Sequence, residues 1–474
     1  MDYSQFLHMI PEATLMAILV VLFIADFASS KQNARRWMNP LACVLMLVQT
    51  LVCLVPQAEV SLFGGMYVTS GAVDVMKAVL AGGTLIVFIQ SRQWLSRADM
   101  HNKEGEFYML IVSTLLGMYM MMSAGHFLLF FLGLEMASIP LACTVAFDKL
   151  RNDSAEAAAK FILTAVFSSG VMLYGISFIY GDCGTLYFDD VAAKLSATPL
   201  SIMGMVFFFS GLGFKVSLVP FHFWTADTYQ GAPTTVTGYL SVISKGAAAF
   251  TLMAILMHVF APLVEYWRYL LYIVVVLSIT VANLFAIRQG ELKRFMAFSS
   301  ISQAGYIMLA AVGNDRLSVA ALSYYVLIYI VANMAVFSVI SVVEQNNGGT
   351  QMKAYDGLYQ TNPKLSFLMT LALFSLGGIP PFAGMFSKFF VFMAAASAGS
   401  VLAYVVVFIA LVNTVISIYY YLLIVKAMYI NKNDNPLPTF TSDGGTRLAL
   451  ALCTLGVLAF GVCSFFYDWL YAAA

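Results

Sequence analysis

Residues 213–233 read GFKVSLVPFHFWTADTYQGAP, and they follow an uncharged run, PLSIMGMVFFFSGL, at 199–212. Lys215 stands just after that apolar run, and Pro220 comes five residues later. A proline inside a helix removes a backbone hydrogen bond and clashes with the preceding turn, and a lysine in apolar surroundings is costly. The two residues together therefore predict a polar site at the break of a helix.

The composition around this stretch is typical of a membrane protein. Of the 474 residues, 61% are hydrophobic and 10% are charged, whereas soluble domains carry about 25% charged residues. A membrane-spanning helix needs roughly 20 apolar residues. Fourteen segments meet that need, at 10–28, 38–56, 70–90, 107–123, 126–147, 157–180, 199–229, 233–260, 267–287, 292–313, 318–343, 364–398, 400–427 and 446–470. We therefore expect an all-α, polytopic integral membrane protein with a single membrane domain over 1–474.

The basic residues at the ends of these segments are distributed unevenly. Sixteen belong to the connections that follow odd-numbered segments: Lys31, Arg35, Arg36, Arg92, Arg97, Lys103, Lys149, Arg151, Arg288, Lys293, Arg294, Lys353, Lys364, Lys426, Lys432 and Arg447. The opposite connections hold only Lys194, Arg268 and Arg316. Because cytoplasmic loops carry the excess of Lys and Arg, we expect both termini on the non-cytoplasmic side.

The remaining lysines fall inside the expected segments: Lys77, Lys160, Lys215, Lys245 and Lys388. Glu135 also lies near the middle of its segment. Lys77 follows Asp74 at a spacing of three, so a local ion pair or a side chain extended to the membrane surface accounts for it. Lys160 is close to the start of its segment and could reach the surface in the same way. The deeper residues, Glu135, Lys215, Lys245 and Lys388, are typical of an ion path.

Two segments are too long for one straight crossing, since 199–229 and 364–398 span roughly 31 and 35 residues. The first is interrupted by Pro220, and the second by Gly377, Gly378, Pro380 and Pro381. In the first segment the lysine precedes the break, and in the second, five segments later, Lys388 follows it. This order predicts two inverted five-helix repeats at 107–260 and 267–427, segments four to eight and nine to thirteen. A three-helix segment at 1–106 and a terminal helix at 446–470 flank them.

The same residues suggest a mechanism based on protons. A lysine in a low-dielectric site loses preference for its charged form, whereas a nearby carboxylate restores it. We expect Glu135 to modulate Lys215, Lys245 to pass the proton along the membrane midplane, and Lys388 to exchange it with one side. His222, two residues after the first break, either relays protons or bonds to a backbone carbonyl that the break has freed.

Other chemistries find little support in the sequence. Its six cysteines are scattered without a CxxC pair, and its five histidines show no HxxxH or HExxH spacing. We therefore expect no metal, haem or iron–sulfur ligation and no bound cofactor in this chain. The net charge is zero, with no basic tail or patch, so nucleic acid is not expected as a partner.

Five stretches resemble the antiporter-like membrane subunits of respiratory complex I, the proton-pumping NADH-quinone oxidoreductase. They are FLGLEMASIPL around Glu135, EAAAKFILTAVFSSG around Lys160, the block FKVSLVPFHFWTADTYQGAPTTVTGYLSVISKGAA at 214–248, ELKRFMAFSSISQAGYIM at 291–308 and SLGGIPPFAGMFSKFFVF at 375–392. The resemblance implies that Glu135 and Lys215 form a Glu–Lys pair with Lys215 as the pump lysine. It also implies that Lys245 lies on the central axis, that Lys388 belongs to the second broken helix, and that Lys160 is an additional lysine.

The resemblance further implies a non-redox subunit of a translocase in an energy-transducing membrane, the inner or plasma membrane if the source is bacterial. Electron transfer from NADH to quinone would occur in partner subunits, through their flavin and iron–sulfur clusters. Neighbouring antiporter-like and small membrane subunits are the implied partners. One departure is Gln303, in SSISQAGY, where many members of the family carry a histidine. Since glutamine cannot gain or lose a proton, a relay at Gln303 would need water or another group.

Other kinds of membrane protein share some of these sequence features. The sister subunits L and M share the Glu–Lys pair, but YQGAPTTVT at 229–237 differs from their pattern, and the sequence ends at Ala474 without a long lateral helix. A subunit of an Mrp-type cation/proton antiporter would share the fold. A stand-alone secondary transporter for an organic solute would also fit the inverted repeat and broken helices, although the set of lysines with one glutamate suits protons better.

Overall fold

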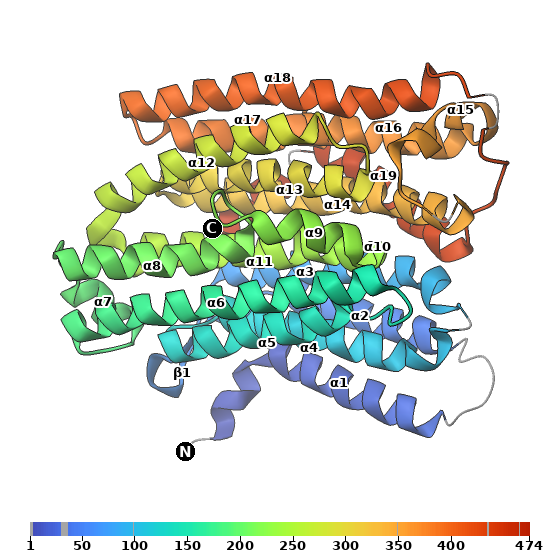
Figure 1. The fold of residues 1–474 in the computed structure, drawn as a ribbon. Helices are drawn as coiled ribbons and strands as arrows, with labels where there is room; N and C mark the ends of the chain where they lie inside the picture. Colours follow the sequence, from blue (N-terminus) through green and yellow to red (C-terminus); the bar gives the residue numbers. More distant parts are fainter. Residues whose placement is uncertain (1–2, 30–36, 98, 348, 434–435, 464) are drawn as a thin grey trace. The chain divides into compact units, whose positions relative to one another are not determined.

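The computed structural model describes residues 3–29, 37–97, 99–347, 349–433, 436–463 and 465–474, and these are nearly all helical (Figure 1). Lys31, Arg35 and Arg36 lie outside the described residues. Within the described part, the strands are β1 (Ser61–Leu62) and β2 (Tyr67–Val68), which pair in antiparallel register with Ser61 opposite Val68. The expected all-α class is confirmed.

The chain divides into two compact units. Unit 1 comprises Met1–Val216, Ile243–Leu270 and Ala473–Ala474, and unit 2 comprises Ser217–Val242 and Leu271–Ala472. The helices of unit 1 are α1 (Ile10–Ala28), α2 (Met38–Leu54), α3 (Gly71–Leu95), α4 (Glu104–Met122), α5 (Phe127–Val145), α6 (Asn152–Cys183), α7 (Phe188–Lys194), α8 (Pro199–Val216) and α11 (Lys245–His258). Short 3₁₀ turns lie at Tyr3–His8, Phe63–Gly65, His101–Lys103 and Ala261–Leu263.

Helices of unit 1 pack in pairs, of which α4 with α5 is the pair that positions Glu135 (Figure 1). These two helices approach closely because each presents a glycine to the other. A Cβ at Gly117 of α4 would lie 2.4 Å from the backbone nitrogen of Ala137, and one at Gly133 of α5 would lie 2.5 Å from that of Met121. Small residues at such crossings are the usual means of close helix packing in membranes.

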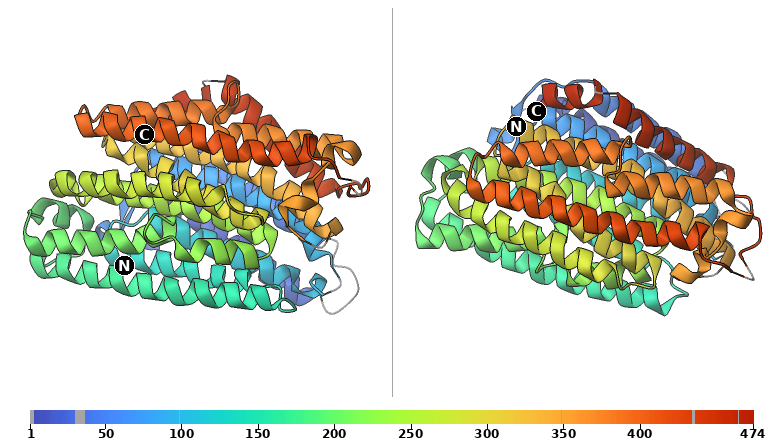
Figure 2. Two further views of the ribbon diagram at one scale, coloured as in Figure 1. Left: turned by 45° about the horizontal axis from the view of Figure 1, so that its top comes forward. Right: turned by 90° about the horizontal axis from the view of Figure 1, so that it is seen from above.

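Unit 2 contains α9 (Phe223–Gly231), α10 (Thr234–Tyr239), α13 (Leu292–Leu309), α14 (Arg316–Asn347), α15 (Leu358–Thr361), α16 (Pro363–Gly377), α17 (Ala383–Ala396), α18 (Val401–Tyr429), α19 (Gly444–Val462) and most of α20 (Phe465–Ala473). Short 3₁₀ turns lie at Ala310–Val312 and Met352–Tyr355. Helix α12 (Val264–Ala286) crosses the boundary between the units. Within unit 2, α14 packs against α16, α17 and α19, and α18 runs along α16 and α17 (Figure 2). Helix α14 is largely apolar and almost entirely buried, which suits its place among these neighbours.

Each of the fourteen expected segments corresponds to one helix or to consecutive helices of the described chain. Among the described residues, twelve helices are long and apolar enough to cross a membrane, and the apolar helices α2, α16 and α17 are shorter. The breaks expected in 199–229 and 364–398 are present, as α8 and α9 and as α16 and α17. A further division was not predicted, since 446–470 forms both α19 and α20. The two repeats, with their bounds, stay a prediction.

Candidate functional site

Lys215 lies in the last turn of α8 and is buried, with 5% of its surface exposed. Its ammonium donates a hydrogen bond of 2.6 Å to the Oγ of Ser138 on α5, and it lies 3.5 Å from the carbonyl oxygen of Ala137. The Ser138 hydroxyl in turn donates to the carbonyl oxygen of Leu134 at 2.6 Å. A neutral hydroxyl therefore holds the Lys215 ammonium against α5.

Glu135 stands one helical turn before Ser138 on α5 and is half-buried. Its carboxylate acts electrostatically on Lys215, yet the two side chains do not approach within the 4.0 Å of a direct ion pair. The Oε1 of Glu135 is buried and has no hydrogen-bond partner among the described residues. A change in the charge of Glu135 can thus influence Lys215 without breaking a salt bridge.

Lys245 begins α11 and is 1% exposed. The expected segment 233–260 is not one regular helix, because Leu240–Ser244 forms a π-helical turn directly before Lys245. Such turns often occur at functional positions, since the extra residue redirects the side chains that follow it. Helix α11 packs against α8, the helix that carries Lys215, and against α4. Unit 1 therefore holds two buried lysines on adjacent helices.

Residues 217–222 form the first helix break. Ser217 has a φ of 67°, and the peptide bond between Val219 and Pro220 is cis. The backbone N–H of Val219, which no helix satisfies, donates to the Oγ of Ser278 on α12 at 2.9 Å. A side chain thus replaces the lost helix bond, as the absence of water in a membrane requires.

His222 directly precedes α9 and is buried, with 9% of its surface exposed. Its ring stacks on that of Phe223, with centroids 4.7 Å apart, and its backbone carbonyl accepts the N–H of Thr225 at 3.0 Å. These contacts assign His222 to the start of α9, and its suggested role as a proton relay stays a prediction.

Residues 378–382 form the second break, between α16 and α17. Gly378 has a φ of 85°, a conformation that glycine adopts at little cost. Its N–H returns to the carbonyl oxygen of Phe374 at 3.0 Å, which closes the end of α16. The peptide bond between Pro380 and Pro381 is cis. On the far side of the break, a Cβ at Gly384 would lie 1.7 Å from the carbonyl oxygen of Ser375, so glycine is required for the two half-helices to meet.

Lys388 lies on α17 and is 4% exposed. Its ammonium donates a 3.0 Å hydrogen bond to the carbonyl oxygen of Gly377, the last residue of α16. It also lies 5.0 Å from the ring centroid of Tyr306. The carbonyl end of a helix favours a cation, so the second break and Lys388 stabilise one another.

Gln303 on α13 is 1% exposed, and both ends of its amide are bonded. Its Nε2 donates to the carbonyl oxygen of Leu376 at 3.2 Å and to the hydroxyl of Tyr421 at 3.1 Å. Its Oε1 accepts the hydroxyl of Tyr325. The Tyr421 hydroxyl also shares a 2.6 Å hydrogen bond with Ser299. Gln303, at which the resemblance implies a histidine in many family members, is therefore the centre of a network of hydroxyl groups.

A cavity of about 10 Å³ lies between Gln303 and Lys388. Its lining also includes Tyr325, Tyr329 and Ser387. A volume of this order is about the minimum that a single water molecule needs. The Tyr329 hydroxyl is buried and has no hydrogen-bond partner among the described residues. Unit 2 thus places a small gap between its buried lysine and its buried glutamine, lined by tyrosine and serine side chains together with aliphatic ones.

Lys160 differs from the other lysines of the expected segments, because its side chain is 45% exposed. It forms an ion pair of 2.8 Å with Glu156, one turn earlier on α6. This exposed pair agrees with a side chain that reaches the surface, although α6 begins earlier than expected, at Asn152.

Lys77 is fully buried, so of its two expected explanations the side chain extended to the membrane surface is wrong, whereas the local ion pair with Asp74 is present. Its ammonium lies 2.7 Å from the Oε1 of Glu12 on α1 and 4.0 Å from Asp74. It also donates to the hydroxyl of Tyr67 at 3.2 Å, and Tyr67 donates to Glu12 at 2.8 Å. Burial and the Glu12 carboxylate raise the pKa of the Tyr67 hydroxyl far above its usual range. Tyr67 therefore remains a hydrogen-bond donor at neutral pH.

Lys293 was expected in a connection between segments but is 1% exposed. Helix α13 begins one residue before it, and its ammonium donates to the carbonyl oxygen of Ala232 at 2.8 Å. The carboxylate of Glu344 lies 3.9 Å away and accepts the hydroxyl of Thr234. The sequence did not indicate this cluster, nor the contacts of Lys77 with Glu12 and Tyr67, because these partners are remote in the chain.

Among the described residues, no group of three or more His, Cys, Asp or Glu is placed to hold a metal ion. The polar side chains that are buried among the helices are mainly those of serine, threonine, asparagine, glutamine and lysine. Ammonium and hydroxyl groups can donate protons and hydrogen bonds, and hydroxyls can also accept them. The arrangement is thus chemically suited to holding and passing protons.

Comparison with known proteins identifies the family of this chain. Residues 124–417 match the family described as NADH:quinone oxidoreductase/Mrp antiporter, TM. NADH-quinone oxidoreductase subunit N from Phocaeicola vulgatus is 59% identical over 472 residues, which cover 99% of each chain. The same subunit from Azobacteroides pseudotrichonymphae is 48% identical over 474 residues, covering 99% of this chain and 98% of the relative.

The fold is also that of a solved protein. A chain of respiratory complex I from Thermus thermophilus, determined with bound aureothin, superposes with a TM-score of 0.80 and 31% sequence identity. The match covers 95% of this chain and 97% of the other. The chain therefore belongs to the NADH:quinone oxidoreductase/Mrp antiporter family and, within it, to the subunit N branch of NADH-quinone oxidoreductase.

Proposed function

We propose that this chain translocates protons as a membrane-arm subunit of NADH-quinone oxidoreductase, and that electron transfer from NADH to quinone in other subunits drives the translocation. The observation that carries the proposal is the environment of Lys215. Its ammonium is buried and bonded to a neutral serine, and a carboxylate lies within electrostatic reach. A lysine in such a place can gain or lose its proton when the neighbouring charge changes.

In unit 1, Glu135 would set the proton occupancy of Lys215, and Lys245 would take the proton onward. The hydroxyl of Ser138 positions the Lys215 ammonium, because it accepts one of the three ammonium protons. Movement of either partner would change the water or hydroxyl to which Lys215 can pass a proton. This assigns Glu135, Lys215 and Lys245 as proton-carrying groups and Ser138 as a positioning residue.

In unit 2, Lys388 would exchange the proton with one side of the membrane. The small cavity between Lys388 and Gln303 is where a water molecule would link the lysine to the hydroxyl groups of Tyr325 and Tyr329. Gln303 cannot titrate, but it holds the hydroxyls of Tyr325 and Tyr421 in position. The relay in unit 2 would therefore pass by water and hydroxyl groups rather than through the Gln303 side chain.

The redox chemistry would lie in partner subunits that hold flavin, iron–sulfur clusters and the quinone. Neighbouring antiporter-like and small membrane subunits would contact this chain in the membrane arm. From the distribution of the basic residues we also propose that both termini lie on the non-cytoplasmic side.

A tagged copy of the chain, purified from its native membrane, tests the assignment. We expect the co-purified material to show NADH:quinone reductase activity that a quinone-site inhibitor abolishes. Recovery of the intact chain alone, or with antiporter subunits and without reductase activity, would contradict the proposal. Sodium-driven or potassium-driven proton exchange by that material would instead assign the chain to cation/proton antiport, and uptake of an organic solute would assign it to secondary transport.

A further inference from the structure

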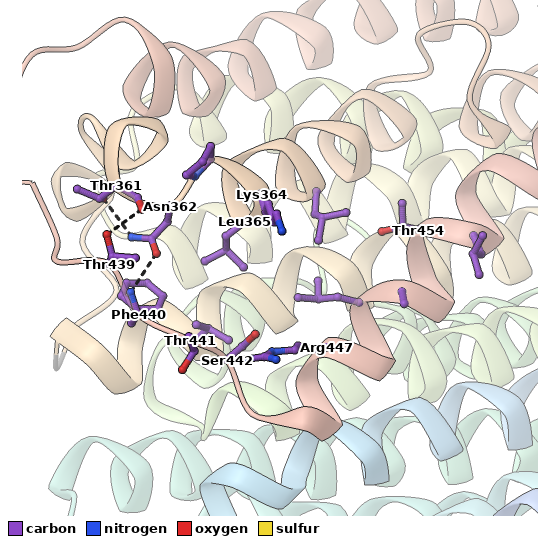
Figure 3. A pocket seen from close by; sticks show the side chains of 16 residues that line it. Thr361, Asn362, Lys364, Leu365, Thr439, Phe440, Thr441, Ser442, Arg447 and Thr454 are labelled. Atoms are coloured by element: carbon purple, nitrogen blue, oxygen red, sulfur yellow. Dashed lines mark hydrogen bonds between the residues drawn. The ribbon is translucent and has the colours of Figure 1, made fainter.

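A large pocket in unit 2 lies away from the buried lysines. It is bounded by α14, α16, α19 and the segment that leads into α19, and its volume is about 860 Å³ (Figure 3). Ligand pockets in proteins commonly have volumes of roughly 300–1,000 Å³. The pocket is therefore large enough to bind part of an organic molecule, and no role proposed above uses it.

Two cations stand at this pocket. Lys364 is in the first turn of α16 and Arg447 is in the first turn of α19, and both are exposed. Figure 3 shows them on opposite walls, above and below the space between the two helices. Neither side chain lies within 4.0 Å of a carboxylate oxygen among the described residues. The nearby Asp443 instead accepts the backbone N–H of Gly445 at 3.0 Å, as the cap of α19.

Hydrogen bonds connect the polar residues at the rim of the pocket. Asn362 donates to the carbonyl oxygen of Pro438 at 3.2 Å and accepts the N–H of Phe440 at 3.2 Å. Thr439 donates to the carbonyl oxygen of Thr361 at 3.1 Å. These bonds, drawn in part in Figure 3, tie the start of α16 to the segment before α19. The start of α16, which carries Lys364, is therefore joined by hydrogen bonds to the segment that leads into α19, which carries Arg447.

Beyond the cations the walls are mostly apolar, with the hydroxyl of Thr454 as an exception. Leu365 and Leu368 of α16 face the space together with Leu450 and Leu455 of α19, and Val342 of α14 also lines it. Since α16 and α19 both begin at the rim and are apolar beyond it, the cations would lie at the level of lipid headgroups and the leucines at the level of acyl chains. A soluble anion would use the cations but would leave the apolar walls without a partner.

We propose that this pocket binds one anionic phospholipid of the surrounding membrane. Its phosphate would lie between Lys364 and Arg447, and one acyl chain would follow Leu365, Leu368, Leu450 and Leu455. Arginine is well suited to bidentate contact with a phosphate, and basic pockets between membrane helices recognise anionic headgroups. The lipid would join α16, the first half of the second broken helix, to α19. None of these residues belongs to the proposed proton relay.

The test uses the assembly purified with the tagged chain and stripped of lipid by detergent exchange. Dioleoyl phosphatidylglycerol or dioleoyl phosphatidylcholine is added, and the bound lipid is counted by native mass spectrometry. The double variant Lys364→Gln/Arg447→Gln removes both cations. The matched control, Lys426→Gln/Lys432→Gln, removes two other exposed cations of unit 2 that do not line the pocket. The variant Leu455→Gln alters an exposed part of the apolar wall.

We expect the unaltered chain and the control to bind one phosphatidylglycerol more tightly than phosphatidylcholine. The double variant should bind it at least about ten-fold more weakly, because each basic residue near a lipid headgroup adds to the attraction. Leu455→Gln should also weaken binding. Equal binding by the double variant and the control, or equal binding of the two lipids, would overturn the proposal. So would full competition by millimolar inorganic phosphate with no effect of Leu455→Gln, which would indicate a soluble anion.

Discussion

The Nζ of Lys215 lies 2.6 Å from the Oγ of Ser138, one helical turn beyond Glu135 on the same helix. The lysine is therefore held by a neutral group, while the carboxylate acts on it from a greater distance. In a direct salt bridge, each charge would stabilise the other in place. Here the ammonium is bonded to a neutral hydroxyl instead, so a change in the charge of Glu135 breaks no direct contact of Lys215.

The variant Ser138→Ala tests this relationship. It removes the acceptor of the Lys215 ammonium, and a hydrogen bond to a charged group contributes about 1.5–3 kcal/mol. We expect protons translocated per NADH oxidised, measured with inverted membrane vesicles, to fall several-fold, whereas Ser138→Thr should preserve most of the ratio. Ser210→Ala is the matched control, because the Ser210 hydroxyl bonds within α8, to the carbonyl oxygen of Val206. Equal ratios for Ser138→Ala and Ser210→Ala would remove Ser138 from the site.

Lys388 combines a structural contact with a proposed transfer role, and two variants separate them. Lys388→Met leaves the carbonyl of Gly377 without its 3.0 Å partner, so both the thermal stability of the assembly and proton translocation should fall. Lys388→Arg can still donate to that carbonyl but does not release its proton. We expect it to retain most of the stability and to lose translocation. Full translocation by Lys388→Arg would show that the residue serves only as a helix cap.

Gln303 can be tested by replacing it with histidine, the residue that many members of the family carry at this position. Gln303→His can still donate and accept hydrogen bonds, and we expect near-normal translocation and stability. Gln303→Leu leaves the Tyr325 hydroxyl, the Tyr421 hydroxyl and a backbone carbonyl with fewer partners. Each buried polar group that loses its partner costs about 1–3 kcal/mol, so the melting temperature should drop clearly. A Gln303→Leu variant with unchanged melting temperature and translocation would contradict the network.

Much of this architecture could be predicted from the sequence, for identifiable reasons. Apolar length located the membrane segments, and Pro220 and the Gly377–Pro381 stretch located the breaks, because these signals are local in the chain. Lys215, Lys245 and Lys388 stood out because a lysine inside an apolar segment is costly. Ser138 did not, since a serine is common in membrane helices. Glu12 on α1 and Lys77 on α3 meet only in the folded unit, and no local pattern in a single sequence gives that contact.

The buried pair of Lys77 and Glu12 predicts a large effect on stability. Removing one partner of a buried ion pair leaves the other charge uncompensated and costs about 3–5 kcal/mol. We therefore expect Lys77→Ala to lower the yield and melting temperature of the assembly. Lys160→Ala is the control, because its ion pair is exposed and such pairs contribute about 0–1 kcal/mol. Similar losses for both variants, or none for Lys77→Ala, would contradict the assignment of Lys77 to a buried pair.

Gly384 predicts a steric effect at the second break. A methyl group there would lie 1.7 Å from the carbonyl oxygen of Ser375, so Gly384→Ala should force α16 and α17 apart and reduce the amount of assembled protein. Gly170→Ala offers the comparison, because a Cβ at Gly170 of α6 meets nothing within 4 Å. Alanine is favoured over glycine in a helix by about 1 kcal/mol, so Gly170→Ala should be neutral or stabilising. Equal yields for the two variants would contradict the requirement for glycine at position 384.

The most direct measurement is the number of protons translocated per NADH oxidised by inverted vesicles that carry Lys215→Ala, with Lys432→Ala as the control for loss of an exposed cation. Both variants should assemble, which the amount of co-purified subunits would verify. We predict a normal ratio for Lys432→Ala and a lower ratio, or a matching loss of NADH oxidation if coupling is tight, for Lys215→Ala. A fully assembled Lys215→Ala enzyme with normal turnover and a normal ratio would contradict the proposal that this chain moves protons through Lys215.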